Sequence, residues 1–201
     1  MKKLVVASSN PGKLAELRTL LSPLGMEIVS QSELGIADAA EPHFTFLENA
    51  LAKARHASSA SGLPALADDS GLCVDALGGE PGVNSAYFAG TEGSREERDA
   101  RNNARLLKDL AMAQDRSAHY ACVVVLVRHA GDPQPLVAEG NWRGEIASVA
   151  CGANGFGYDP LFLLPGLGKT SAELESAEKN RLSHRAKALQ QLIDRMREEA
   201  R

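Results

Sequence analysis

Two short runs of uninterrupted apolar residues, each next to a helical pattern, constrain the fold of this chain most. The runs are residues 4–7 and 63–67. A strand without apolar/polar alternation is typical of a sheet that is buried on both faces and covered by helices. After the first run, Asn10 is a suitable N-cap and Pro11 fits the first helical position. Leucines then recur at helical spacing, at positions 14, 17, 21 and 24.

The rest of the chain continues this alternation of strands and helices. A helix starts at Thr45, where Glu48 completes a capping box, and stops at Gly62. Its predicted buried stripe is Leu47, Ala50, Leu51, Ala54 and Ala57, with Asn49, Lys53 and His56 on the polar face. We expect further strands at 27–30, 120–127 and 135–149, helices at 95–112 and after Ser183, and a short capped helix at 170–173. The pattern predicts one α/β domain over residues 1–201.

Charge and composition exclude several classes of partner. The 201 residues carry a formal charge of −4, whereas nucleic-acid-binding domains are usually basic, so no nucleic-acid partner is expected. The longest apolar run, residues 120–127, is far shorter than the ~20 residues that cross a bilayer, so no membrane partner is expected. The three cysteines are widely spaced and odd in number. They indicate neither a disulfide framework nor a zinc site, and they favour a cytoplasmic location.

The segment between the first strand and the first helix has the composition of a phosphate-binding turn. It consists of Ser8, Ser9, Asn10, Pro11, Gly12 and Lys13. The N–H groups and the dipole at a helix N-terminus favour an anion, and Lys13 opposes that dipole unless an anion is present. An ordinary strand-to-helix turn is equally consistent. The segment is not a P-loop, because Ala7 and Leu14 replace the required Gly and Ser or Thr.

Two adjacent carboxylates, Asp68 and Asp69, follow the second apolar run, and Ser70 and Gly71 favour a tight turn there. A divalent cation or a shared proton relieves the repulsion between such carboxylates. Mg²⁺ prefers hard oxygen ligands, usually one or two carboxylates together with substrate phosphates. The segment therefore favours a metal or catalytic site, and the alternative is an Asx-type turn that ends the strand.

Two later segments also suggest ligand binding. Glycines flank Phe156 in residues 155–160, so the backbone can approach a planar ligand and Phe156 or Tyr158 can stack on a base. A glycine-rich loop held by two buried aromatic residues is the alternative. Lys179 and the pair His184-Arg185 concentrate positive charge near the start of the last helix, against its dipole. Such a conflict indicates function, whereas solvated surface cations are the simpler interpretation.

Taken together and in this order, these segments resemble the inosine triphosphate pyrophosphatase family, also called dITP/XTP pyrophosphatases. The matching pieces are SSNPGK at 8–13, FLENALAKARHA at 46–57, LPALADDSGLCVDALGG at 63–79, GFGYDP at 155–160 and EKNRLSHR at 178–185. They span nearly the whole chain, and their spacing resembles the bacterial branch. One departure is Ser9, where bacterial members often have Gly, and its side chain narrows the expected phosphate turn at this position.

The resemblance implies a fold and an activity. The fold is an elongated mixed β-sheet flanked by helices, with two lobes and a central cleft, and family members are usually homodimers. The activity is hydrolysis of deaminated purine nucleoside triphosphates (ITP, dITP and XTP) to the monophosphate and pyrophosphate. The reaction uses Mg²⁺ and cleanses the nucleotide pool.

The resemblance also implies roles for single residues, carried over by matching position. Asp69 is the general base, Glu41 and Asp69 hold the metal, and Asp68 supports them. Lys13 and Lys53 neutralise phosphate charge, and Ser70 contacts the substrate. The phosphates are bound by Ser8, Ser9, Asn10, Pro11, Gly12 and Lys13, and the base by Phe156, Gly157, Tyr158, Asp159, Lys179, His184 and Arg185.

Base choice follows from hydrogen-bond donors and acceptors. Hypoxanthine and xanthine carry an oxygen at ring position six, which accepts from His184 or Arg185, whereas adenine carries a donor there. Sites built around such a bond reject the wrong base strongly. GTP shares that oxygen and must be excluded at its two-amino group, by residues that the sequence does not identify.

Three other functions compete with this one. A related pyrophosphatase for modified pyrimidine or methylated nucleotides would not need the His184-Arg185 pair. A non-catalytic nucleotide sensor gains nothing from carboxylates beside the phosphates unless a metal is bound. A nucleic-acid-binding module is disfavoured by the negative net charge.

Overall fold

The computed structural model describes residues 3–199 and divides into two compact units. Unit 1 is made of Met1–Asp69, Cys122–Gly140 and His184–Arg201, and unit 2 of Ser70–Ala121 and Asn141–Ser183. Residues 1, 2, 200 and 201 of the expected domain lie outside the described part. The single domain over residues 1–201 stays a prediction.

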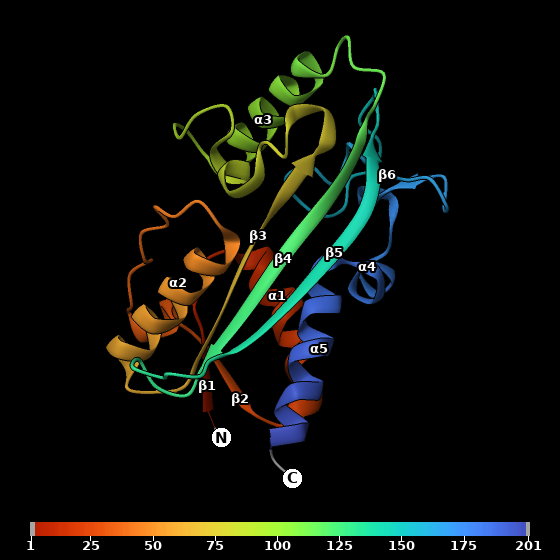
Figure 1. The fold of residues 1–201 in the computed structure, drawn as a ribbon. Coiled ribbons are helices and arrows are strands. Elements are labelled where there is room, and N and C mark those ends of the chain that lie inside the picture. The colour runs from red at the N-terminus through yellow and green to blue at the C-terminus, as the bar shows by residue number, and fades with distance from the viewer. Residues whose placement is uncertain (1–2, 200–201) are drawn as a thin grey trace. The chain divides into compact units, whose positions relative to one another are not determined.

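The described residues form one mixed sheet with flanking helices, as expected (Figure 1). The helices are α1 Pro11–Leu21, α2 Phe46–Ser61, α3 Arg95–Asp109, α4 Ser176–Leu182 and α5 His184–Glu199. The strands are β1 Lys3–Val6, β2 Glu27–Ser30, β3 Ala65–Val74, β4 Ser117–Val127, β5 Leu136–Ile146, β6 Phe162–Leu164 and β7 Lys169–Thr170. Their order is β2-β1-β3-β4-β5-β6-β7. β1 pairs in parallel with β2 and β3, and β6 pairs antiparallel with β5 and β7.

In unit 1 both faces of the sheet are covered, which explains the uninterrupted apolar runs. Leu4 and Leu66 pack with residues of α1 and α5 on one face. Val5 and Ala65 pack with the alanines of α2 on the other. Successive residues of a strand point to opposite faces, so a strand covered on both sides is apolar at every position. Figure 1 shows α2 on one side of these strands and α1 and α5 on the other.

The helix starts in unit 1 follow the predicted capping residues. The Asn10 side chain accepts from the Lys13 N–H, and the Thr45 side chain accepts from the Glu48 N–H. Two details of the α2 prediction are wrong. Leu47 is 40% exposed, while Asn49 is only 1% exposed, so the buried face of α2 includes a polar residue. Asn49 lies one helical turn before Lys53, and both contact Asp69 in the middle of β3.

The core of unit 2 combines aliphatic residues with a group of buried aromatic rings. The Phe162 ring centroid lies 4.6 Å from that of Tyr120 and 5.4 Å from that of Trp142. The sequence predicted a helix at 95–112, which ends at Asp109 in the structure, and a short capped helix at 170–173. In the structure both begin with a capping box. The sequence did not predict β6, β7 or α4. These elements are 3, 2 and 7 residues long, too short to show a clear hydrophobic period.

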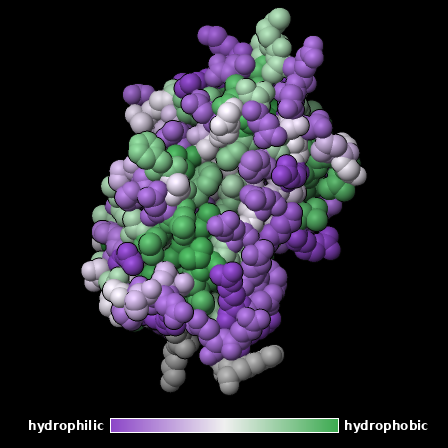
Figure 2. Space-filling model, in the orientation of Figure 1, coloured by the Kyte–Doolittle hydropathy of each residue, from purple (hydrophilic) through white to green (hydrophobic). Residues whose placement is uncertain are grey.

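The last helix is amphipathic. Its inner face packs Ala188, Leu189 and Leu192 on the sheet of unit 1, and Figure 2 shows hydrophilic side chains along its outer side. Gly140 on β5 is required for this packing, because a Cβ there would lie 2.1 Å from the His184 carbonyl oxygen. Among residues 3–199, no helix is long and apolar enough to cross a membrane.

Candidate functional site

β3 does not turn at residues 68–71 but continues to Val74, so the predicted tight turn is wrong. The strand conformation has a direct consequence for the two carboxylates. Because side chains alternate along a strand, Asp68 points to the face covered by α1 and α5, and Asp69 to the face covered by α2. Their partners agree with this, since Asp68 contacts Lys13 and Asp69 contacts Lys53. Unit 1 therefore contains two linked ionic clusters, one on each face.

The first cluster joins Asp69 to residues of α2 and of the preceding loop. The Lys53 ammonium lies 2.9 Å from Asp69 Oδ1 and 3.0 Å from Glu41 Oε2. The Asn49 amide donates to Asp69 Oδ2 at 3.2 Å, so both oxygens of Asp69 are held. Asp69 is buried and Glu41 is exposed. Two carboxylates thus converge on one cation at the surface end of a buried site.

Burial and charge act against each other in this cluster. Burial raises the pKa of Asp69 above its usual value, although Lys53 and Lys13 act in the opposite direction. Burial favours the neutral amine of Lys53, but the charges of Asp69, Asp68 and Glu41 outweigh it and raise the Lys53 pKa. Lys53 is therefore a cation at neutral pH, and Asp69 is the carboxylate with the greater tendency to take up a proton.

The second cluster lies on the other face of β3 and is more deeply buried. Asp68 is 2% exposed, and its Oδ2 lies 3.2 Å from both the Lys13 ammonium and the Arg185 Nε. Arg185 also contacts Glu16 of α1. Burial alone would raise the pKa of Asp68, but Lys13, Arg185 and Lys53 outweigh it and hold that pKa well below its usual value. Asp68 is consequently a permanent anion that links α1, β3 and α5.

Arg185, a predicted base-binding residue, lies in the second, buried cluster. Its side chain is 2% exposed and forms ion pairs with Asp68 and Glu16. The physical reason is that Arg185 lies on the inner face of α5, where the two carboxylates compensate its desolvation. His184, the first residue of α5, is 5% exposed and also belongs to unit 1. Roles for these two residues in base binding stay predictions.

The predicted phosphate turn forms the N-terminus of α1, as expected. The side chains of Asn10 and Ser8 form hydrogen bonds within this turn. Asn10 Oδ1 accepts from the Lys13 N–H, and Ser8 Oγ accepts from the Asn10 N–H. Pro11 and Gly12 begin the helix. Ser9 Oγ donates to Asp38 at 2.7 Å. The Ser9 side chain is therefore directed to a neighbouring loop of unit 1.

The remaining predicted site residues form a cluster of their own in unit 2. Asp159 is 2% exposed and accepts from the Lys179 ammonium at 2.6 Å, the Ser171 hydroxyl at 3.0 Å and the Phe156 N–H at 2.9 Å. The Lys179 Nζ lies 5.0 Å from the centroid of the Phe156 ring. Asp159 thus orients a lysine and an aromatic ring together, which is an arrangement suited to a flat, polar ligand.

The other predicted residues of unit 2 lie at the edge of this cluster. Tyr158 is 3% exposed and its hydroxyl donates to the Ser85 carbonyl at 2.9 Å, so it is part of the core. Gly157 has a φ of +64°, in the left-handed region that favours glycine. Ser70 is half-buried on β3. Its predicted substrate contact stays a prediction.

The donor set of the first cluster fits a magnesium ion. Among residues 3–199, no three Asp, Glu, His or Cys side chains form a metal-ligating group. Asp69 and Glu41 nevertheless converge on one cation, the ammonium of Lys53. Mg²⁺ usually binds one or two carboxylates and completes its shell with water and substrate phosphates, so two converging carboxylates are sufficient.

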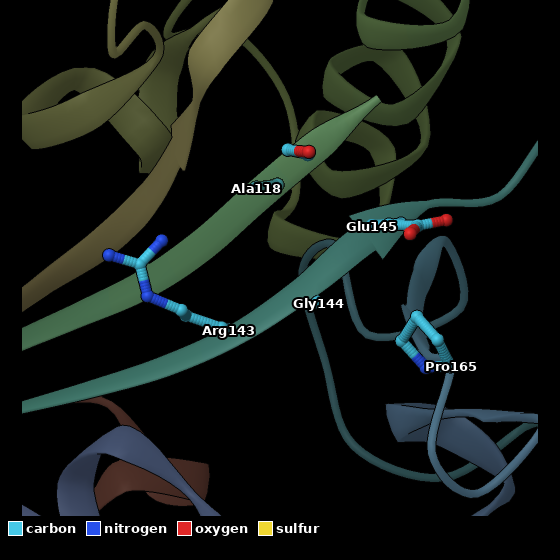
Figure 3. Close-up of a pocket in the computed structure, with 6 residues that line it drawn as sticks. Ala118, Arg143, Gly144, Glu145 and Pro165 are labelled. Atoms are coloured by element: carbon cyan, nitrogen blue, oxygen red, sulfur yellow. The ribbon is translucent and has the colours of Figure 1, made fainter. Parts of the chain in front are cut away.

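An open pocket of about 240 Å³ in unit 2 is unrelated to these clusters. It is lined by Ser117, Ala118, Arg143, Gly144, Glu145 and Pro165, none of which is a predicted site residue. Figure 3 shows the charged ends of Arg143 and Glu145 pointing away from one another. The pocket therefore lacks convergent polar groups.

Sequence reasoning missed three residues of the clusters. Asn49 carried a usable signal, because it lies four residues before Lys53 and such pairs share a helix face. Glu16 lies three residues after Lys13, so the two share a helix face and the same spacing argument could have identified Glu16. Ser171 carried none, since its contact with Asp159 depends on how the loops of unit 2 fold.

Comparison with known proteins gives concordant matches over the whole chain. The model of the Ham1 family matches residues 4–195. A dITP/XTP pyrophosphatase of Ralstonia nicotianae is 62% identical, with 98% of each chain covered. A dITP/XTP pyrophosphatase of Nitrosomonas europaea is 60% identical over 98% of this chain and 96% of its own length. A HAM1 protein from Coxiella burnetii, 46% identical, superposes with a TM-score of 0.90 over 98% of this chain and 100% of that one.

Proposed function

The chain belongs to the Ham1 family, and we propose that it hydrolyses deaminated purine nucleoside triphosphates to the monophosphate and pyrophosphate. The expected substrates are ITP, dITP and XTP. The names of its relatives support the substrate class. The observation that carries the chemistry is the Lys53 ammonium held between the carboxylates of Asp69 and Glu41.

The net charge of the two ionic clusters in unit 1 supports binding of a divalent cation. The two clusters contain Lys13, Lys53 and Arg185 against Glu16, Glu41, Asp68 and Asp69, which leaves one excess negative charge. A triphosphate is also an anion, so these groups alone repel it. We infer that Asp69 and Glu41 hold Mg²⁺. When bound, the ion would supply positive charge to the phosphate oxygens.

Asp69 is the proposed general base. The Asn49 amide and the Lys53 ammonium fix the orientation of its carboxylate. It orients a water molecule toward the α-phosphorus and takes its proton as the bond to the leaving pyrophosphate breaks. A positioned carboxylate that takes up this proton typically raises the rate by about 10²–10⁴-fold. Lys13 and Lys53 stabilise the charge that develops on the pyrophosphate.

Base binding is assigned to Phe156 and Lys179 of unit 2. Phe156 stacks on the purine, and stacking does not distinguish one base from another. The Lys179 ammonium is only a donor, so it pairs with an oxygen at ring position six and not with the amino group of adenine. Asp159 accepts a hydrogen bond from Lys179 and holds the ammonium in place. Rejection of GTP requires a further contact with its two-amino group.

The position of water attack tests this mechanism. ITP is hydrolysed in H₂¹⁸O with Mg²⁺, and the products are analysed by mass spectrometry. Attack at the α-phosphorus places the label in IMP, whereas label in pyrophosphate contradicts the proposal. Parallel assays with modified pyrimidine and methylated purine nucleotides test the related pyrophosphatases. Tight ITP binding without any product identifies a sensor. The homodimer and the cytoplasmic location stay predictions.

A further inference from the structure

One face of α3 is directed at the loop that carries Phe156. Arg95, Asp99 and Asn103 recur every four residues along the helix, and all three contact this loop within unit 2. The Gly157 N–H donates to Asp99 Oδ2 at 3.0 Å. The Asn103 amide donates to the Gly157 carbonyl at 2.9 Å. The Arg95 guanidinium carbon lies 4.6 Å from the centroid of the Phe156 ring.

These contacts fix a segment whose glycines have high conformational freedom. Gly155 and Gly157 have φ angles of +75° and +64°, so the residues on both sides of Phe156 are in the left-handed region. Glycine reaches this region at little steric cost, but it also has the largest conformational freedom to lose. Both polar groups of Gly157 are fixed by α3, one of them by a carboxylate, which makes a stronger hydrogen bond than a neutral acceptor.

We propose that Asp99, Asn103 and Arg95 are positioning residues for nucleobase binding. They hold Phe156 in its stacking orientation before the substrate arrives. The inference rests on the proposed function, in which Phe156 stacks on the purine. A ring that is already ordered loses less freedom on binding, so the α3 contacts improve substrate affinity. They contribute nothing to the reacting phosphates, which are assigned to the ionic clusters of unit 1.

The expected kinetic signature is a change in KM without a change in kcat. Loss of an interaction that is equal in the ground state and the transition state raises KM alone. Asp99→Ala should raise the KM for ITP about tenfold, as expected when a charged hydrogen-bond partner is lost. Asn103→Ala should raise it severalfold. Stacking tolerates every base, so the KM for XTP should rise by the same factor.

Two variants serve as controls. Asp99→Asn keeps an acceptor for the Gly157 N–H and should restore most of the affinity. Asp109→Ala removes a carboxylate from the same helix, where Asp109 pairs with the exposed Arg105 at 3.3 Å. It should leave KM unchanged. If Asp99→Ala does not fold, Asn103→Ala and Asp99→Asn carry the test.

A double-mutant cycle with Phe156→Ala separates positioning from a general structural effect. If Asp99 acts through Phe156, Asp99→Ala adds no further rise in KM in the Phe156→Ala background. If the two substitutions instead raise KM by independent factors that multiply in the double mutant, the proposal is overturned. An unchanged KM in Phe156→Ala would instead refute base stacking itself. A raised KM in Phe156→Ala, with wild-type KM in Asp99→Ala and Asn103→Ala, would refute only the positioning role.

Discussion

Replacement of Arg185 by alanine tests whether the buried ionic cluster of unit 1 stabilises the fold. The Arg185 side chain is 2% exposed and those of Asp68 and Glu16 are 1% and 15% exposed. Arg185→Ala removes the guanidinium that Asp68 and Glu16 share. Both carboxylates then remain in a poorly solvated site, and Asp68 keeps Lys13 as a partner at 3.2 Å.

The magnitude follows from the cost of leaving a buried charge uncompensated. Removal of one partner from a buried ion pair typically costs about 3–5 kcal/mol. The remaining contact of Asp68 with Lys13 favours the lower end, about 3 kcal/mol. For a chain of this size, each kcal/mol lowers Tm by about 2–4 °C, so the expected decrease is about 6–12 °C.

The assay is thermal unfolding at neutral pH, followed by circular dichroism. The matched control is Arg18→Ala, because Arg18 pairs with Glu33 and both side chains are about half exposed. A surface pair contributes at most about 1 kcal/mol, so Tm should fall by no more than about 4 °C. A Tm for Arg185→Ala equal to that of the control would show that the fold does not depend on the buried guanidinium. A lower ITP-over-ATP ratio of kcat/KM in that case would assign Arg185 to base recognition instead.

Three further predictions address the base, a turn and a surface carboxylate. Asp69→Asn should lower kcat by about 10²–10⁴-fold while Tm stays near that of the wild type. Asp132→Ala should destabilise the protein by about 2–4 kcal/mol in denaturant unfolding, because the buried Asp132 accepts from the Arg128 and Gln134 N–H groups. Glu33 should titrate with a pKa of about 2 in an NMR titration, held there by the Ser30 N–H and then by Arg18. Glu33→Gln should destabilise the protein at pH 7. Because the Glu33 pKa is lowered from 4.5, this destabilisation should disappear as the pH falls to about 2.

Each of these predictions has a result that contradicts it. Near-normal turnover of Asp69→Asn with Mg²⁺ present would exclude Asp69 as the base. Wild-type stability of Asp132→Ala would show that water replaces Asp132 as the acceptor for the Arg128 and Gln134 N–H groups. A Glu33 pKa near 4.5 would mean that its contacts do not persist in solution.

The local signals in the sequence predicted the helices of unit 1 well. Asn10 and Thr45 cap the helices that they were expected to cap, because capping depends only on neighbouring residues. The apolar runs at 4–7 and 63–67 correctly indicated a sheet covered on both faces. The resemblance to the pyrophosphatase family correctly predicted a mixed sheet. The match to the Ham1 family model confirms the predicted family.

Features that depend on tertiary contacts could not be predicted in the same way. Residues 68–71 have turn-forming composition, yet they continue β3 because Asp68 and Asp69 find cationic partners on the two faces. Asn49 shares a helix face with Lys53, but its burial against Asp69 depends on how α2 packs on the sheet. Arg185 also finds its partners far along the chain, since Asp68 lies 117 residues away.

Asp69 and Glu41, with Lys13 and Lys53, are proposed to support hydrolysis of a triphosphate only when a divalent cation is bound. The most direct measurement is pyrophosphate release from ITP, XTP, ATP and GTP, with Mg²⁺ and with excess EDTA. We expect rapid release from ITP and XTP with Mg²⁺, slow release from ATP and GTP, and none with EDTA. Undiminished release from ITP in EDTA would contradict this proposal.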